Sequence, residues 1–325
     1  MSGPVPRLLL LGAGSMGALH ARVISQHSGC ELAGVVDPRA DAGRKLAERF
    51  ETTWRPTLDS LAGVDALVVA TSTETHAQLA QQALDDGVPI LVEKPLTTSP
   101  VVTRDLVAAS AARDVPLMCG LLERYNPAVL TASRLISQPI GVKAIRHSPY
   151  APRIMTGVAW DLLIHDIDLA LRFVDSPVTT VQGVSARFSP VSKPGAEDVC
   201  EATIAFASGA VATASASRVA QRKVRTITVF ELDKLFEIDL LLRTVTIHHH
   251  IAAEAMAPDG RGYRQQTIIE IPELVTSREP LASQLDQFLE LIAGESDASA
   301  ERDSILPAHD VVGAVVESVR LGDAQ

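Results

Sequence analysis

The residue types and spacing of three side chains in this 325-residue sequence suit proton transfer. They are Lys94, Asp161 and His165. Lys94 follows an apolar run at 88–92 and precedes Pro95, a rigid residue that limits where the lysine can point. Asp161 stands four residues before His165, so on a helix its carboxylate can orient the imidazole and stabilise its cation. Such a histidine can take a proton from a hydroxyl while the lysine polarises the oxygen. A solvated surface lysine is the alternative reading of Lys94.

The residues around Asp161 show a helical pattern over 158–174. Charged residues recur on this helix at i, i+4, i+7 and i+11, which predicts one polar stripe. The stripe consists of Asp161, His165, Asp168 and Arg172. A solvated face with an i,i+4 pair would also explain the stripe. Its neighbours are apolar, however, and favour a mostly buried helix in which charged groups serve a function.

A glycine-rich turn near the N-terminus indicates phosphate binding. Residues 12–17 read GAGSMG, follow the apolar run 7–11 and open a helical pattern. The first glycine of this pattern permits a tight turn, the second lets the backbone approach a pyrophosphate, and the third lets helix and strand pack closely. The helix N-terminus then offers amide groups to the phosphates. We predict cofactor contacts from Gly12, Gly14, Ser15, Met16 and Gly17.

Asp37 ends the predicted strand at 31–36 and stands 20 residues after Gly17. Its carboxylate is placed to bind the ribose hydroxyls of a dinucleotide. A carboxylate there repels a 2′-phosphate and favours NAD, whereas Arg39 could bind that phosphate in NADP. We expect NAD to be preferred, with Pro38 and Arg39 beside the adenosine. A turn with an N-capping aspartate is the alternative.

Two further segments follow predicted strands and are expected at the same edge of the sheet. The first segment, at 70–76, carries hydroxyls that can contact the cofactor and cap the next helix, and capping alone would also explain them. The second is Glu93 with Lys94. From both segments we predict cofactor contacts by Ala70, Thr71, Ser72, Thr75, His76, Glu93 and Lys94.

Substrate-binding candidates lie mainly beyond residue 120. The segment 120–127 contains Arg124, a residue suited to a phosphate or carboxylate, and Pro127 restarts the chain as a helix. We predict substrate contacts by Lys94, Arg124, Tyr125, Asn126, Tyr150, Arg153, Asp161 and His165.

The order of apolar runs and helical patterns defines an α/β protein with two domains. Up to 121, strands alternate with helices of 10–15 residues, which indicates a parallel sheet and a Rossmann dinucleotide-binding domain. From 178 to 270 short strands follow one another and should pair antiparallel. We divide the chain into a cofactor domain at 1–121 and a substrate and oligomerisation domain at 122–325, with a cleft along their junction.

Composition restricts the partners. The net charge of −10 disfavours nucleic acid, and no apolar run reaches the length of a membrane span. Three cysteines, widely spaced, suit a reducing cytoplasm. His248 and His250 would share a face of a strand, but no third ligand is evident nearby, so we predict no metal site.

In combination, these features resemble the Gfo/Idh/MocA family of oxidoreductases. The features that carry the resemblance are GAGSMG, Asp37, the segment 71–76, EKP at 93–95 and Asp161 with His165. The resemblance implies a Rossmann domain followed by an α/β domain with a large, mainly antiparallel open sheet. It places Lys94, Asp161 and His165 at the family's catalytic positions. It also implies homodimers or homotetramers formed through the open sheet face.

Two stretches narrow the resemblance. GLLERYNPAV at 120–129 and DLLIHDIDLALRF at 161–173 are similar to the branch that oxidises the 3-hydroxyl of UDP-N-acetylglucosamine or its uronic acid. That branch carries GHIERFNPAV, whereas Leu121 and Tyr125 stand here in place of His and Phe. We expect hydride transfer between a nicotinamide and a carbinol carbon of a sugar, nucleotide sugar or cyclitol, with His165 or Lys94 transferring the proton. The alternatives are a catalytically silent dinucleotide sensor, a reductase of the imine or biliverdin type, and a methyltransferase.

Overall fold

The computed structural model describes residues 5–150, 156–254 and 263–323, except for the side chains of 251–254, 263–265 and 320–323. The chain forms two compact units. The first unit consists of Met1–Leu122 and Glu279–Gly313, and the second of Glu123–Arg278 and Ala314–Gln325. The first unit thus includes a C-terminal segment that the division at 121 placed in the second domain.

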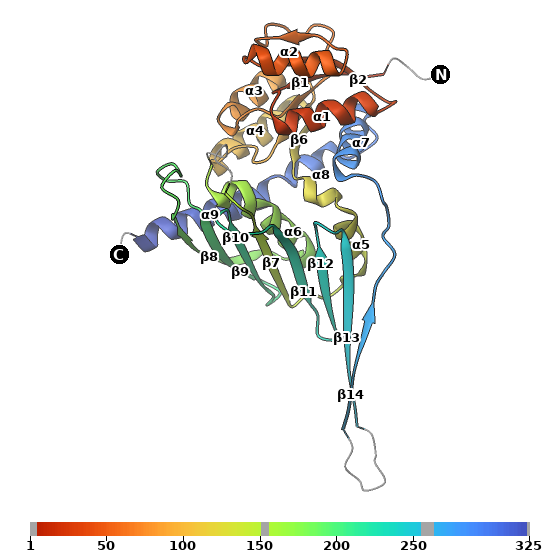
Figure 1. The fold of residues 1–325 in the computed structure, drawn as a ribbon, viewed down its shortest axis with the longest axis vertical. Coiled ribbons are helices and arrows are strands. Elements are labelled where there is room, and N and C mark those ends of the chain that lie inside the picture. The colour runs from red at the N-terminus through yellow and green to blue at the C-terminus, as the bar shows by residue number, and fades with distance from the viewer. Residues whose placement is uncertain (1–4, 151–155, 255–262, 324–325) are drawn as a thin grey trace. The chain divides into compact units, whose positions relative to one another are not determined.

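Six parallel strands form the sheet of the first unit, in the order β3-β2-β1-β4-β5-β6. Strands β1, β2 and β6 are labelled in Figure 1. Their bounds are β1 (Arg7–Leu11), β2 (Glu31–Val36), β3 (Trp54–Arg55), β4 (Ala66–Val69), β5 (Ile90–Glu93) and β6 (Leu117–Gly120). Only β3, two residues long, was not predicted. This order is that of doubly wound dinucleotide-binding folds. Ligands bind such sheets at the carboxyl ends where the strand order reverses, which here means between β1 and β4.

Helices pack on this sheet. Those of the segment Glu279–Gly313 contact helices and a strand from the first 122 residues and so join this segment to the rest of the unit. They are α1 (Ser15–Gln26), α2 (Ala40–Arg49), α3 (Thr73–Asp85), α4 (Pro100–Arg113), α7 (Pro280–Ala293), α8 (Ala298–Asp303) and the start of α9 (Leu306–Asp323). Helix α7 contacts α1, and α8 contacts α4 and β6. Arg22 donates to Glu279 at 3.0 Å, and His27 lies 2.9 Å from Asp286. These polar contacts fix α7 against α1.

The second unit is built on an eight-stranded sheet with the order β14-β13-β12-β11-β7-β10-β9-β8. Its strands are β7 (Gly141–His147), β8 (Val178–Ala186), β9 (Val199–Phe206), β10 (Val211–Ser217), β11 (Val224–Phe230), β12 (Lys234–Asp239), β13 (Thr244–Glu254) and β14 (Tyr263–Glu270). Strands β7 and β10 are parallel, and the other neighbours are antiparallel. The predicted α/β class, with a mainly antiparallel second sheet, is therefore confirmed.

One face of this sheet is covered by helices. The helical segments of the second unit are η1 (Leu122–Tyr125), α5 (Pro127–Leu135), η2 (Ala159–Leu163), α6 (Ile164–Val174) and the end of α9. Helix α5 contacts β12 and β13, and α6 contacts β7 and β10. Strand residues alternate accordingly: Val142 and Ala144 are buried, while Lys143 on the other face is exposed. Among the described residues, no helix has the length and apolar character needed to cross a membrane.

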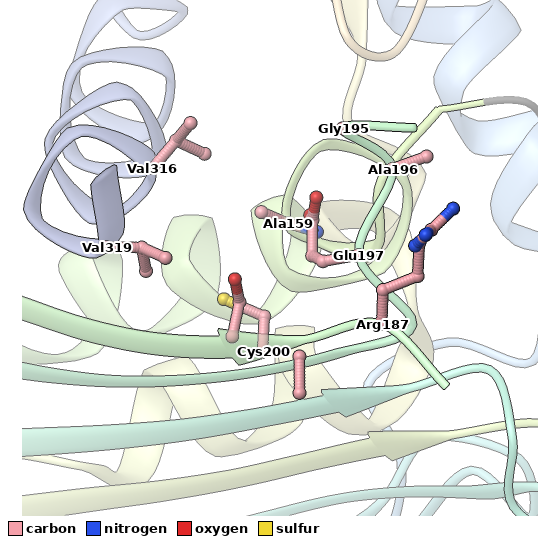
Figure 2. A pocket seen from close by; sticks show the side chains of 10 residues that line it. Ala159, Arg187, Gly195, Ala196, Glu197, Cys200, Val316 and Val319 are labelled. Carbon is pink, nitrogen blue, oxygen red and sulfur yellow. The ribbon is translucent and has the colours of Figure 1, made fainter. Parts of the chain in front are cut away.

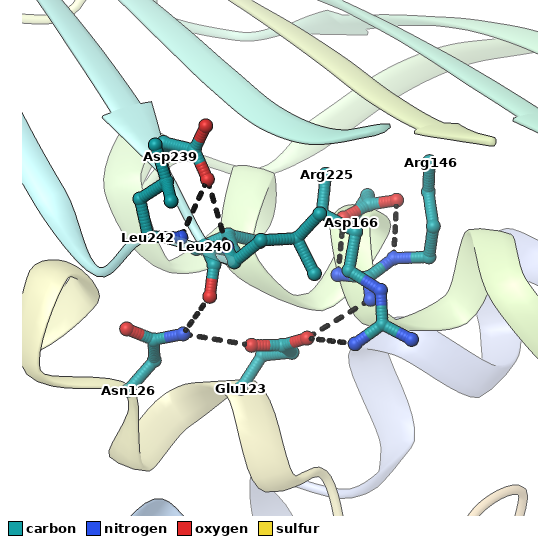
Figure 3. Close-up of polar contacts among 9 residues, drawn as sticks. Glu123, Asn126, Arg146, Asp166, Arg225, Asp239, Leu240 and Leu242 are labelled. Carbon is teal, nitrogen blue, oxygen red and sulfur yellow. Dashed lines mark hydrogen bonds and ion pairs between the residues drawn. The ribbon is translucent and has the colours of Figure 1, made fainter. Parts of the chain in front are cut away.

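Buried charges hold α6 against the sheet (Figure 3). Arg146 of β7, whose side chain is 2% exposed, donates to both carboxylate oxygens of Asp166 at 2.8 and 2.9 Å. It also donates to Glu123 at 2.9 Å. Arg225 lies opposite Arg146 in the β7–β11 register and reaches the same Glu123 oxygen at 3.4 Å. Burying such charges is costly, and the bidentate geometry offsets the cost only while every partner is present.

We predict that Asp166→Ala lowers the free energy of unfolding by about 3–5 kcal/mol, because it leaves the buried Arg146 cation without its main partner. Urea denaturation measures this change. The control is Asp233→Ala, at an exposed aspartate of the same unit, which should stay within about 0.5 kcal/mol of wild type. Equal denaturation midpoints for the two variants would contradict the structural role of the pair.

Candidate functional site

The glycine turn after β1 has the shape that a pyrophosphate requires. Gly12 has φ +105°, and a Cβ there would lie 2.5 Å from the Ala70 carbonyl oxygen. A Cβ on Gly17 would lie 1.9 Å from the Gly12 oxygen. Gly14, in contrast, faces open space within 4 Å of its missing Cβ. Two glycines are therefore required by close packing, and the middle one leaves room for a ligand at the N-terminus of α1, as a dinucleotide site demands.

Asp37 at the end of β2 is tied to this turn. Its buried carboxylate accepts a hydrogen bond from the Ala13 amide at 2.7 Å and another from the Arg39 amide at 2.9 Å. The exposed Arg39 guanidinium pairs with the same carboxylate at 2.8 and 3.0 Å. Burial raises the pKa of Asp37, but the contacts with Arg39 and Ala13 outweigh it and hold the pKa below its ordinary value. The carboxylate is thus charged and supports the loop that a cofactor would contact.

The segment after β4 differs from expectation in one respect. Ser72 occupies the N-cap position of α3, yet its side chain makes no capping hydrogen bond. Instead Thr75 donates to the Ser72 carbonyl at 2.9 Å, and the Thr71 and Thr75 hydroxyls lie 2.7 Å apart. The capping interpretation of these side chains is therefore wrong. The exposed hydroxyls of Thr71 and Thr75 stay available as cofactor ligands.

Three buried histidines hold the segment 93–96, which contains Lys94. His20 of α1 donates to Glu93 at 2.7 Å, and His76 of α3 donates from Nδ1 to the Pro95 carbonyl at 2.9 Å. His309 of α9 accepts from the Leu96 amide at 3.0 Å. These histidines are 4%, 1% and 0% exposed, respectively.

The histidines fix Lys94 through its neighbours on the chain. Burial lowers the pKa of His76 despite its hydrogen bonds to carbonyls, so the ring stays neutral and keeps its Nδ1 proton for Pro95. A Cβ on Gly120 would meet Glu93 atoms at 3.0–3.2 Å, so β6 also packs closely on this segment. Lys94 itself is half-buried. Only the rigid Pro95 was predicted from the sequence to limit the lysine, and the structure adds the three histidines.

The sequence predicted one helix that carries both Asp161 and His165. In the second unit, Asp161 lies in a π-helical turn, and His165 lies on the α-helix that follows it. Residues 159–163 form a π-helical turn, and the α-helix begins at Ile164. Both side chains are half-buried. One member of the predicted polar stripe, Asp168, is buried and paired with Arg124. The remaining member of the stripe, Arg172, is exposed. π-Helical turns are frequent at functional sites, where they redirect side chains.

Two predicted substrate ligands have structural partners within the chain. Arg124 is 7% exposed and donates to both oxygens of Asp168 at 2.6 and 2.8 Å, joining η1 to α6. Asn126 is 2% exposed, caps α5 through the Ala128 amide at 3.1 Å and donates to Glu123 at 3.1 Å. Their contact with the substrate stays a prediction.

The other predicted substrate ligands have varied settings. Tyr125 is half-buried in η1. The Tyr150 hydroxyl lies 3.3 Å from Ser192 Oγ. Arg153 lies outside the described residues.

Several residues of the site were not predicted. Arg225 is one of them: burial and the Arg146 cation lower its pKa, against the attraction of Glu123, Asp166 and Asp161. Arg225 therefore lies within the electrostatic reach of Asp161. The sequence signal that could have identified Arg225 is an arginine at an inward-facing position of a strand. The same signal marks Arg146.

Glu197 is another residue that the sequence analysis missed. It lines a cavity of about 270 Å³ together with Ala159, Arg187 and Cys200, and with Val316 and Val319 of α9 (Figure 2). Burial raises the pKa of the Cys200 thiol to about 12, so this cysteine is unreactive at neutral pH.

The histidine run on β13 pairs with carboxylates. His248 lies 2.9 Å from Glu237, and His249 lies 3.3 Å from Glu270. Within the described part of the chain, no group of three or more His, Cys, Asp or Glu residues is arranged to hold a metal.

Family models match two segments of the chain. Residues 7–121 match the model described as oxidoreductase family, NAD-binding Rossmann fold, and residues 137–231 match the GFO/IDH/MocA C-terminal domain. The chain belongs to the Gfo/Idh/MocA oxidoreductase family.

Curated relatives act on sugars and cyclitols. UDP-N-acetylglucosamine 3-dehydrogenase from Acidithiobacillus ferrooxidans is 30% identical over 287 residues, which cover 87% of this chain and 88% of the relative. The scyllo-inositol 2-dehydrogenase (NAD(+)) of Bacillus subtilis is 29% identical over 65% of this chain and 67% of its own.

Solved structures agree with these relatives. The A. ferrooxidans enzyme superposes with a TM-score of 0.83 at 28% identity and covers 98% of this chain and 100% of its own. GenD2 from gentamicin A biosynthesis, in complex with NAD, has a TM-score of 0.83 at 25% identity and covers 98% and 95% of the two chains. The branch similarity read from 120–129 and 161–173 is therefore supported.

We predict that Gly14→Ala weakens NAD binding at least about tenfold, equivalent to about 1.4 kcal/mol, without changing the melting temperature. The added methyl enters open space and meets no protein atom, but it blocks close approach of the pyrophosphate. Calorimetric titration with NAD and thermal denaturation measure the two effects.

The control is Gly141→Ala in β7, where an added Cβ meets only ordinary contacts at 3.5 Å or more. It should leave both quantities unchanged. NAD affinity equal to wild type in the Gly14 variant would contradict the assignment of this turn to the cofactor.

Proposed function

We propose that this protein is an NAD(P)-dependent dehydrogenase that transfers a hydride between the nicotinamide and a carbinol carbon of a sugar, nucleotide sugar or cyclitol. The observation that carries the proposal is the support built around Lys94. Three buried histidines hold its segment at the carboxyl ends of the strands of the first sheet. The residues of this sheet match the family model of an NAD-binding Rossmann fold. Residues 1–121 supply the cofactor domain, on which the segment 279–313 packs, and the rest of 122–325 supplies the substrate and oligomerisation domain.

When bound, the nicotinamide would supply the hydride acceptor or donor. The chain moves the proton and stabilises charge. His165 takes the hydroxyl proton of the substrate, and Asp161 orients the ring and stabilises its cation. Lys94 donates to the reacting oxygen, so negative charge that develops on it is stabilised. Tyr125 and Tyr150 contact the substrate.

The cofactor is held by the glycine turn and its surroundings. Gly12, Gly14, Ser15, Met16 and Gly17 bind the pyrophosphate, and Asp37 binds the adenosine ribose. For this, Arg39 must release part of the carboxylate that it now covers. The hydroxyls of the 70–76 segment and the residues Glu93 and Lys94 complete the cofactor site. The charged Asp37 disfavours a 2′-phosphate, and NAD is therefore the preferred cofactor.

We also assign the open face of the second sheet to contact with another copy of the chain, as a homodimer or homotetramer. The strand registers place one row of mainly hydroxyl-bearing side chains across this face. The row consists of Gln182, Thr203, Thr213, Lys143, Thr228, Glu237 and Thr246.

The function is tested with a panel of substrates that includes UDP-N-acetylglucosamine, its uronic acid, scyllo-inositol and myo-inositol, followed at the nicotinamide absorbance. At least one panel member should be oxidised. Lys94→Met and His165→Ala should each lower kcat for that substrate by about 10²- to 10⁴-fold, because each removes a group that acts in proton transfer. NAD binding and stability should stay near wild type in His165→Ala.

Matched controls are Lys223→Met, at an exposed lysine, and His248→Ala, at a histidine of β13 that pairs with Glu237. Both should keep wild-type kcat. Wild-type turnover in Lys94→Met and His165→Ala together would refute the mechanism. NAD binding without turnover of any panel member would favour the dinucleotide sensor.

For the cofactor, we predict tighter binding of NAD than of NADP to wild-type protein. Asp37→Ala should weaken NAD binding about tenfold or more and narrow the difference between the two cofactors. Arg39→Ala should leave NAD binding equal or tighter, because it frees the carboxylate. Calorimetry with both cofactors measures these constants, and tighter binding of NADP by the wild type would contradict the preference.

A further inference from the structure

The helix that carries Asp161 and His165 begins without a cap from its own sequence. Val158 is the N-cap residue of η2, and no side-chain hydrogen bond caps it there. The first amides of a helix have no partner within the helix, so they need acceptors from elsewhere. Here both acceptors come from Glu197: its carbonyl oxygen accepts from the Val158 amide at 3.2 Å, and its Oε1 accepts from the Ala159 amide at 2.7 Å.

The chain is shaped to admit this carboxylate. A Cβ on Gly157 would lie 2.0–2.4 Å from the carboxylate atoms of Glu197. Any other residue at 157 would therefore push Glu197 away from the Ala159 amide. The Asp161 amide in turn donates to the Gly157 carbonyl at 3.0 Å, so the turn at 157–161 and the carboxylate fit together as one unit.

Glu197 is itself anchored to the sheet. Arg218 donates to its carbonyl at 2.6 Å and pairs with Asp198 at 3.2 Å. Asp198, which is fully buried, also accepts from the amides of Phe188 and Ser189 at 2.7 Å. The backbone beneath the carboxylate is therefore fixed, and the position of Oε1 is transmitted to the helix start.

The cavity beside these groups determines what happens when the carboxylate is lost. It borders both Ala159 and Glu197 (Figure 2). Shortening Glu197 enlarges this space and supplies no replacement acceptor for the Ala159 amide. Burial raises the pKa of the Glu197 carboxyl, although the Ala159 amide opposes this. A protonated carboxyl retains a carbonyl oxygen that can accept the same hydrogen bond, as a glutamine does.

We infer that Glu197 is a positioning residue for the reaction, because it holds the first turn of the helix from which Asp161 and His165 extend. The inference rests on the proposed function of that pair. A displacement of about 1 Å in a reacting group can cost about 10²-fold in rate. Glu197 thus acts through the geometry of η2 and need not contact the substrate.

The test compares E197Q, E197A and G157A, with the panel substrate of highest kcat/KM and with NAD. E197A and G157A should lower kcat about 10- to 100-fold while leaving the Kd for NAD unchanged. E197Q should retain most of the wild-type kcat, because its amide oxygen still accepts from Ala159. In the E197A background, G157A should have little further effect, since the clashing carboxylate is gone.

Hydrogen exchange of the amides at 158–161 provides an arm that needs no substrate. Protection should be lost in E197A and retained in E197Q. Wild-type kcat in E197A and G157A, with His165→Ala inactive, would overturn the inference and leave the proposed function standing. Wild-type protection in E197A would overturn it as well. If E197A does not fold, G157A decides: a lowered kcat supports the inference, and an unchanged kcat overturns it.

Discussion

The buried pairing of Arg146 with Asp166 is the interaction on which the second unit depends. A guanidinium that is 2% exposed cannot lie beneath a helix unless carboxylates compensate it, and Asp166 and Glu123 do so. Because Asp166 belongs to α6, Glu123 to η1 and Arg146 to β7, one cluster fixes two helical segments on the sheet (Figure 3). The Arg124–Asp168 pair repeats the connection between η1 and α6. The orientation of α6, and with it the position of His165, follows from these charges.

Lys94 in the first unit is supported by different means. Its segment is held by hydrogen-bonded imidazole rings, contributed by His20, His76 and His309 from three helices. A histidine can donate from one nitrogen and accept at the other, so it can satisfy a buried carbonyl or a buried amide without adding a charge. The hydrogen bonds of His76 to Pro95 and of His309 to Leu96 therefore hold the backbone there at low electrostatic cost.

The sequence predicted most of the fold because its signals are local. Apolar runs that alternate with helical patterns identified the strands from β1 to β6 except β3, whose two residues carry no periodicity. The glycine turn was identified for the correct reason, since Gly12 and Gly17 have no room for a side chain. The helix at 158–174 was predicted from spacing, but spacing cannot reveal the π-helical turn, in which the Ala159 amide donates to the distant Glu197.

The side-chain partners of the site were harder to predict. Arg124 was predicted to bind an anion because it follows a strand. Its observed partner, Asp168, lies 44 residues away. Asp168 was predicted to belong to a polar stripe that is either solvent-facing or catalytic. Glu197 and His309 contact their targets across 38 and 213 residues. Contacts at such separations depend on tertiary packing, and no local pattern in a single sequence encodes them.

Isotope transfer is the direct test of whether this chain moves a hydride from a carbinol carbon to the nicotinamide. Panel substrates labelled with deuterium at each carbinol carbon are incubated with NAD and the protein, and the reduced cofactor is analysed by mass spectrometry. We expect the reduced nicotinamide to carry deuterium from one labelled position of a sugar, nucleotide sugar or cyclitol. Reduced cofactor that carries no deuterium from any labelled substrate would contradict this expectation.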